Sequence, residues 1–197
     1  MKHIRAILLS AAAVVSAHAG VVNGGFETGD FTGWTVGATG AVDTTAPHTG
    51  LYAALFNGPS DSITQTIATN PGDTYSISFW LADQGPGIPP NSSFEVDWDH
   101  GTVFTLTSTA DMAYTERVIH NLTASGPTTD ITFMFGQVPV DTGLCSGFQP
   151  GVWAFDDVAV YQGNGDPPDA APEPASIGLA VLAAGGLIAL NFRRKRA

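Results

Sequence analysis

The sequence predicts an all-β protein whose main body, residues 20–162, folds as an antiparallel jelly-roll β-sandwich. Short segments of this body alternate between apolar and polar residues, as in "TYSISFWLA" at 74–82 and "SFEVDWD" at 93–99, and a period of two is typical of strands with one buried face. Turn sequences such as "NPGD" at 70–73 separate the segments about every ten residues, a spacing typical of sandwiches and jelly rolls. The strands that we expect are residues 62–68, 74–82, 93–99, 102–108, 114–124, 130–137 and 152–162.

The first 19 residues have the pattern of a secretory signal peptide, which we expect to be cleaved after Ala19. Two basic residues, Lys2 and Arg5, precede an apolar run over residues 6–15, and "AHA" at 17–19 supplies small residues at the cleavage position. This apolar run is too short to span a bilayer, whose hydrocarbon core is roughly 30 Å thick. The sequence therefore predicts that the body is exported.

A polar linker and an apolar segment follow the body. Residues 163–171, "GNGDPPDAA", have the composition of an extended, solvated linker. Residues 175–190 are apolar, and a helix over them would be roughly 24 Å long at about 1.5 Å per residue, which is short for a bilayer core. We expect a single transmembrane helix here, with its basic end held in the cytoplasm by the positive-inside rule. The basic residues are Arg193, Arg194, Lys195 and Arg196.

Pro172, Glu173 and Pro174, directly before the apolar segment, are not explained by membrane physics. Together with the short helix and the arginine-rich end they resemble the PEP-CTERM sorting signal of Gram-negative bacteria. The resemblance covers residues 172–197 and implies recognition by an exosortase-type processing enzyme. It implies a protein that is first membrane-anchored and then reaches the cell surface or extracellular matrix, in association with exopolysaccharide and biofilm. The alternative is a plain single-span anchor.

Charge is distributed unevenly along the chain. Of the seven Lys and Arg residues only Arg117 lies in residues 20–171, where 17 of the 18 acidic residues lie, so 17 negative charges against one positive charge give a net charge of about −16. This charge repels phosphate backbones and excludes nucleic acid as a partner, whereas it attracts cations. The single cysteine, Cys145, leaves no internal disulfide, and no basic residue near it would activate the thiol.

Three short motifs follow one another along the body. They are "NGGFE" near its start, "HTGLYAALF" in its first third and "FDDVAV" in its last expected strand. In this order they resemble the galactose-binding-like jelly rolls of many carbohydrate-binding modules, over residues 21–161.

That resemblance implies a structural calcium ion where the first and last strands meet. It places two carboxylate ligands at Glu27 and Asp156, joined by backbone carbonyls around His48 and Gly50. Calcium prefers such oxygen ligands, and a metal that pins both chain ends would stabilise a domain without disulfides. The alternative is that Glu27 and Asp156 are ordinary acids of a turn and a strand end.

Trp80 is the candidate residue for sugar binding, because an exposed aromatic ring stacks on the apolar face of a sugar. Alternation places it with Ser76 and Ser78, opposite the apolar face of its strand. Tyr114 and Arg117, on another expected strand, alternate to opposite faces and do not share one platform. The alternative for Trp80 is packing under a loop. The residues expected in the core or under loops are Trp34, Trp98 and Trp153.

A catalytic role would fall to Glu95 and Asp97, which share one face of an expected strand, roughly 6–7 Å apart. The carboxylates of glycosidases have comparable separations. Neighbouring acids on an exposed strand usually form a solvated face, and the sequence has no metalloprotease, serine-hydrolase or phosphate-binding motif.

We therefore expect an exported, non-catalytic protein of the cell surface or matrix that binds or associates with polysaccharide. The alternatives are a structural surface protein without a discrete ligand site and, less favoured, a glycan hydrolase.

Overall fold

The computed structural model describes residues 20–37, 39–84, 92–108, 110–137 and 152–165, and the structural statements below concern these residues. They form ten strands and no helix. The strands are β1 (Thr35–Val36), β2 (Gly40–Asp43), β3 (Ala53–Phe56), β4 (Ser60–Ala68), β5 (Thr74–Gln84), β6 (Ser92–Trp98), β7 (Gly101–Ser108), β8 (Met112–Thr123), β9 (Thr128–Gln137) and β10 (Val152–Gln162).

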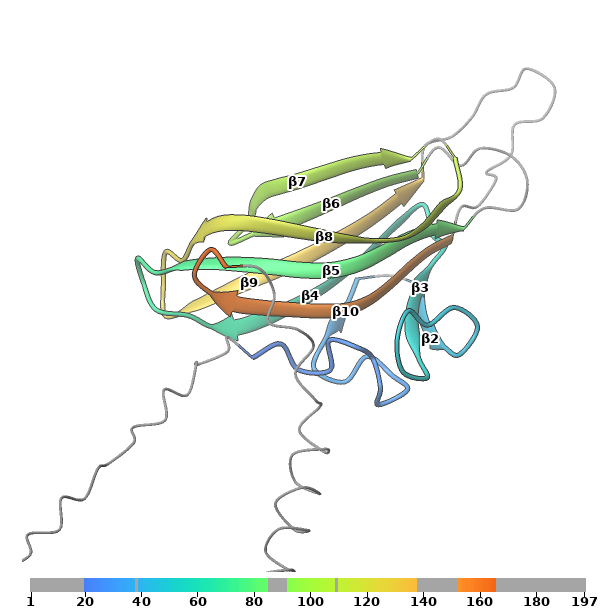
Figure 1. Ribbon diagram of the computed structural model, residues 1–197, viewed down its shortest axis with the longest axis horizontal. Coiled ribbons are helices and arrows are strands. Elements are labelled where there is room, and N and C mark those ends of the chain that lie inside the picture. The colour runs from blue at the N-terminus through green and yellow to red at the C-terminus, as the bar shows by residue number, and fades with distance from the viewer. Residues whose placement is uncertain (1–19, 38, 85–91, 109, 138–151, 166–197) are drawn as a thin grey trace, which may run out of the picture. The chain divides into compact units, whose positions relative to one another are not determined.

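The strands build two five-stranded sheets in which all neighbours are antiparallel. The strand orders are β1-β4-β9-β6-β7 and β2-β3-β10-β5-β8, and Figure 1 shows one sheet lying over the other. Only the β2–β3 and β6–β7 connections join neighbours in one sheet. The others cross between the sheets, as in a jelly roll. The predicted all-β, antiparallel two-sheet class is therefore confirmed.

Phenylalanine fills much of the core between the sheets. Phe79, Phe94, Phe133 and Phe155 are at most 1% exposed, and the rings of Phe133 and Phe155 have centroids 4.7 Å apart. Burial of one such side chain stabilises a fold by roughly 1.5–3 kcal/mol, so this aromatic core can hold a domain that has no disulfide.

The seven expected strands are all present, whereas β1, β2 and β3 were not predicted. These three strands have two to four residues each, too few for alternation to be read from the sequence. The three tryptophans expected in the core are buried, with Trp34 8%, Trp98 5% and Trp153 1% exposed. The expected turn at 70–73 is also present, since the Asp73 N–H donates to the Asn70 carbonyl at 3.1 Å.

The chain divides into two units, Met1–Gly165 and Asp166–Ala197. All ten strands and the buried core belong to the first, so residues 20–165 contain every element of the described fold. In the ranges that the structure describes, no helix is long and apolar enough to cross a membrane. The expected signal peptide, the end of the linker, Cys145, the sorting motif and the basic tail lie outside those ranges.

Candidate functional site

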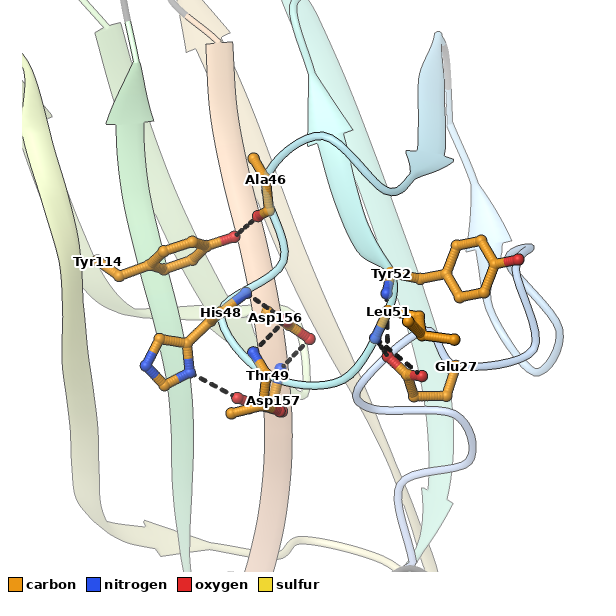
Figure 2. Close-up of polar contacts among 9 residues, drawn as sticks. All are labelled: Glu27, Ala46, His48, Thr49, Leu51, Tyr52, Tyr114, Asp156 and Asp157. Carbon is orange, nitrogen blue, oxygen red and sulfur yellow. Dashed lines mark hydrogen bonds and ion pairs between the residues drawn. The ribbon is translucent and has the colours of Figure 1, made fainter.

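The candidate site is built around residues 46–52, which connect β2 to β3 and which we call the acid-anchored loop. Carboxylates from two distant segments accept its backbone N–H groups (Figure 2). One is Glu27, in the N-terminal segment, and the other is Asp156, on β10. These segments lie side by side, since the Val158 N–H donates to the Gly24 carbonyl at 3.0 Å.

Glu27 holds the end of the loop that leads into β3. Its Oε1 accepts the N–H of Leu51 at 2.9 Å and of Tyr52 at 3.1 Å. Gly50 has φ +65, and a Cβ atom there would lie 2.2 Å from Glu27 Oε1. A glycine is therefore required, both for the left-handed backbone and for the approach of the carboxylate.

Asp156 holds the other end of the loop from a fully buried position. Its Oδ2 accepts the N–H of His48 at 2.9 Å and of Thr49 at 3.3 Å, and its Oδ1 accepts the N–H of Asp157 at 2.8 Å. Burial, and then the negative charge of Asp157, raise the pKa of Asp156 to about 7, although the three N–H donors favour the charged form.

Asp157 also faces the loop, although neighbouring residues of a strand normally point to opposite faces. The register of β10 against β5 shifts between Asp156 and Ala159, and Asp157 has φ +51. This bulge lets Asp157 Oδ2 bond His48 Nδ1 at 2.7 Å, while Oδ1 accepts from Thr49 Oγ1 at 2.7 Å.

Three aromatic rings lie beside the loop, on the outer face of the sheet that contains β5 and β8. The His48 ring stacks on Trp80 with centroids 3.8 Å apart and planes 15° apart, and lies 5.1 Å from the Tyr114 ring. Tyr114 Oη donates to the Ala46 carbonyl at 2.7 Å. All three rings are half-buried. Burial, then the charges of Asp156 and Asp157, raise the pKa of the Tyr114 phenol.

The donors suit a hard cation, because they are oxygens. A Cβ atom built at Gly25 would lie 3.5 Å from Asp157 Oδ1, 3.8 Å from Asp156 Oδ1 and 3.8 Å from Glu27 Cγ, so two carboxylate oxygens and the Cγ methylene of a third acid lie near this glycine. Backbone N–H groups already occupy oxygens of Glu27 and Asp156. Within the described ranges, no three His, Cys, Asp or Glu side chains are placed to hold one metal together. The residues fit calcium if loop carbonyls complete the shell.

Trp80 lies where the sequence places it, on the face of β5 opposite Phe79, but the His48 ring covers one of its faces. Tyr114 and Arg117 do lie on opposite faces of β8, which pairs with β5. Arg117 is opposite Phe79, on the core side, whereas Tyr114 reaches the outer aromatic cluster.

Glu95 and Asp97 alternate with buried residues along β6 and share its partly exposed face. Thr102 Oγ1 donates to Glu95 Oε1 at 2.5 Å. The acids of the candidate site are far along the chain from this pair.

Sequence reasoning missed Asp157, Thr49 and the involvement of Tyr114 with the loop. The doubled acid "DD" in the last strand was the available signal, because two consecutive acids on a buried strand indicate a bulge or a polar partner. Nothing in the sequence indicated that His48 would stack on Trp80, since 32 residues separate them.

Comparison with known proteins supports the fold. No protein-family model matches the chain, and no curated protein matches it by sequence. The carbohydrate-binding module TmCBM61, solved in complex with β-1,4-galactotriose, is similar with a TM-score of 0.55 at 20% identity, over 75% of this chain and 99% of that one.

Two further solved structures have the same likeness. The CBM22-1 xylan-binding domain of Paenibacillus barcinonensis Xyn10C has a TM-score of 0.55 at 12% identity, over 79% of this chain and 100% of that one. The enzymatically active domain of bacteriophage CBA120 tailspike protein 4 has a TM-score of 0.53 at 14% identity, over 74% of this chain and 21% of that one. At these identities, the chain is shown to share a jelly-roll fold with carbohydrate-binding modules.

Proposed function

We propose that this chain is an exported, non-catalytic protein of the cell surface or extracellular matrix that binds polysaccharide on the outer face of the β5–β8 sheet. The observation that carries the proposal is the cluster of His48, Trp80 and Tyr114. Half-buried rings held rigidly beside polar groups are suited to stacking on sugar rings. Two solved structures with the same fold, TmCBM61 and CBM22-1, are a galactotriose complex and a xylan-binding domain.

The test is a binding titration of residues 20–165 with a panel of soluble β-linked glycans, read by calorimetry and by thermal melts. We expect at least one glycan to bind and to raise the melting temperature. Trp80→Ala should weaken binding about tenfold or more, because loss of a central aromatic contact removes much of the affinity. Leu51→Ala is the control, since Leu51 is 67% exposed on the same loop and is not part of the cluster. Equal loss in both variants would refute the assignment of the platform.

Calcium is part of this proposal. Glu27 and Asp156 would hold the ion together with carbonyls of the acid-anchored loop, around His48 and Gly50. When bound, calcium would supply a positive counter-charge to the buried Asp156 and would fix the loop. The carboxylate oxygens of Asp156 and Asp157 near Gly25, with the side chain of Glu27 beside them, support it.

Export and sorting complete the proposal. An exosortase-type enzyme would recognise Pro172, Glu173 and Pro174 after the C-terminal helix has anchored the chain with Arg193–Arg196 on the cytoplasmic side. Replacement of the three motif residues by alanine should leave the protein in the membrane fraction of the host, whereas the wild-type chain reaches the surface or the medium. Equal release of both would refute recognition through this motif.

Two alternatives have distinct expectations. A structural matrix protein without a ligand site would bind no glycan, and its association would depend on calcium or ionic strength. A hydrolase would release reducing sugars and would lose this activity in Glu95→Gln or Asp97→Asn.

A further inference from the structure

The two sheets have four edge strands, whose outer backbone N–H and C=O groups have no partner strand in the described ranges. Such edges are templates for pairing with another chain, and proteins protect them with short strands, charges, inward-pointing charges and bulges. Three of the four edges are protected in this way. Strand β1 has two residues and β2 has four. Strand β8 is long, but it carries Glu116, an inward-facing Arg117 and two register shifts against β5.

The fourth edge, β7, lacks most of this protection. Its eight residues, "GTVFTLTS", include no charge and no proline, and Thr, Val and Phe favour strands. Its register shifts once against β6, opposite the step from Val96 to Asp97, which leaves residues 104–108 regularly paired. Phe104 and Leu106 lie on the core side and remain half-buried. The edge therefore offers both free backbone groups and apolar side chains.

Charge decides which partner suits this edge. The exported part of the chain has 17 acidic residues against Arg117, so two copies repel each other over most of their surfaces. Strand β7 is a long edge without charge, so it is a part of the surface where two copies can approach each other without opposing like charges on the strand itself. We propose that β7 is a docking surface for a second copy of this chain, with β7 of each copy paired antiparallel across a two-fold axis.

The sequence of β7 is complementary to itself in such a pair. Directly opposed residues of antiparallel strands share a face, so an axis at Thr105 sets Thr105 against its own copy and Phe104 against Leu106 of the second copy. Apolar side chains then meet on the core side, and threonine meets threonine on the outer side. Glu95 lies opposite Thr105 on β6, so the two Glu95 residues are three strand spacings, about 14 Å, apart. That distance exceeds the Debye length of about 8 Å at physiological salt.

This inference does not depend on glycan binding. The experiment is sedimentation equilibrium of residues 20–165 over a wide concentration range, with chelator present and no glycan. We expect a reversible monomer–dimer equilibrium that becomes tighter as salt is raised, because salt screens the repulsion between acidic surfaces. Association through bound calcium would be lost in the presence of chelator. Association through ion pairs would become weaker, not tighter, as salt is raised. A monomer at every concentration and salt level would overturn the proposal.

Variants locate the interface. Thr105→Glu combined with Thr107→Glu should weaken dimerisation about tenfold or more, since Thr105→Glu sets two like charges against each other at the axis and Thr107→Glu adds a charge opposite Val103 of the second copy. Thr123→Glu is the matched control for Thr105→Glu alone, because it makes the same single change at an exposed position of the β8 edge. An equal effect of both changes would overturn the proposal.

A second measurement needs no variant and so does not depend on how the variants fold. Hydrogen exchange of the wild-type protein should show that the amides of β7 become more protected as concentration rises, while those of β8 do not change. Protection elsewhere with none on β7 would contradict the pairing.

Discussion

The imidazole ring of His48 lies parallel to the indole ring of Trp80, with centroids 3.8 Å apart. The first ring belongs to the acid-anchored loop and the second to β5. His48 is also held by Asp156 through its backbone N–H and by Asp157 through Nδ1. The acids that anchor the loop therefore also position one wall of the aromatic cluster, and the candidate metal site and the candidate sugar site are mechanically connected.

This connection predicts the effect of His48→Ala. The change removes a stacked pair and a hydrogen bond to a carboxylate, so we expect a loss of about 1–2 kcal/mol in the free energy of unfolding. Trp80 becomes more exposed to water, and tryptophan fluorescence should shift to longer wavelength. His100→Ala is the control, because the His100 side chain is 82% exposed and loses only a 3.9 Å contact between its Nε2 and Asp130 Oδ2. Unchanged fluorescence in His48→Ala would show that the rings do not stack in solution.

The glycine at position 50 provides a second prediction. Gly50→Ala should destabilise the domain by about 2–4 kcal/mol, because its Cβ atom would lie 2.2 Å from Glu27 Oε1 in addition to the strain of φ +65. Gly72→Ala separates these effects, since Gly72 has φ +84 and nothing within 4 Å of its Cβ position. Only the backbone strain, about 1 kcal/mol, should appear there. Urea denaturation measures both, and equal losses would mean that Glu27 does not approach the loop.

Asp83 predicts a pH dependence. It is fully buried, and neither carboxylate oxygen has a hydrogen-bond partner of good geometry in the described ranges. Burial raises its pKa, and the nearby hydroxyls of Ser108 and Ser92 offset this only in part. The folded state therefore keeps the proton to a higher pH than the unfolded state. The stability that this proton contributes is complete below the unfolded pKa of about 3.9 and falls as pH rises through the folded pKa.

Asp83→Asn should remove this loss and stabilise the domain at pH 8 by about 1–2 kcal/mol, with less gain at low pH. Asp43→Asn is the contrasting variant. The side chain and then the backbone N–H of Thr45 lower the pKa of Asp43, so its contribution is present above the unfolded pKa and is lost as pH falls. Denaturation curves across pH should show the two variants changing stability at neutral pH in opposite directions. The same direction in both would contradict the burial of an unpaired Asp83.

Removal of metal provides the last prediction. Chelator should lower the melting temperature of residues 20–165 relative to excess calcium, because a ligand present at about a hundred times its dissociation constant stabilises a fold by about 2.7 kcal/mol. Asp156→Asn should abolish this difference, and Glu27→Gln should reduce it. Glu95→Gln is the control, because Glu95 lies on β6, in the sheet that does not contain Asp156. This variant should keep the difference in melting temperature between calcium and chelator. A wild-type protein that melts at the same temperature in both conditions would contradict calcium binding.

The sequence made much of the fold predictable but little of the site. Alternation along β5 and β6 identified which residues are buried, because a strand with one covered face needs a period of two. Short strands such as β3 have no room for that pattern. Glu27 and Asp156 were found through a resemblance, whereas Asp157 joins them through a bulge between Asp156 and Ala159, for which the doubled acid was a signal that did not specify the geometry.

The same division holds for the molecule as a whole. By itself, the sequence determined the all-β class, the expected strands and the acidic character of the body, because these depend on local periodicity and composition. Only the tertiary structure decided that His48 covers Trp80, that three acids meet around Gly25 and that β7 is left as an uncharged edge. Those relationships join segments up to 132 residues apart, as between Gly25 and Asp157, and depend on strand order and register, which the spacing of residues along the chain does not specify.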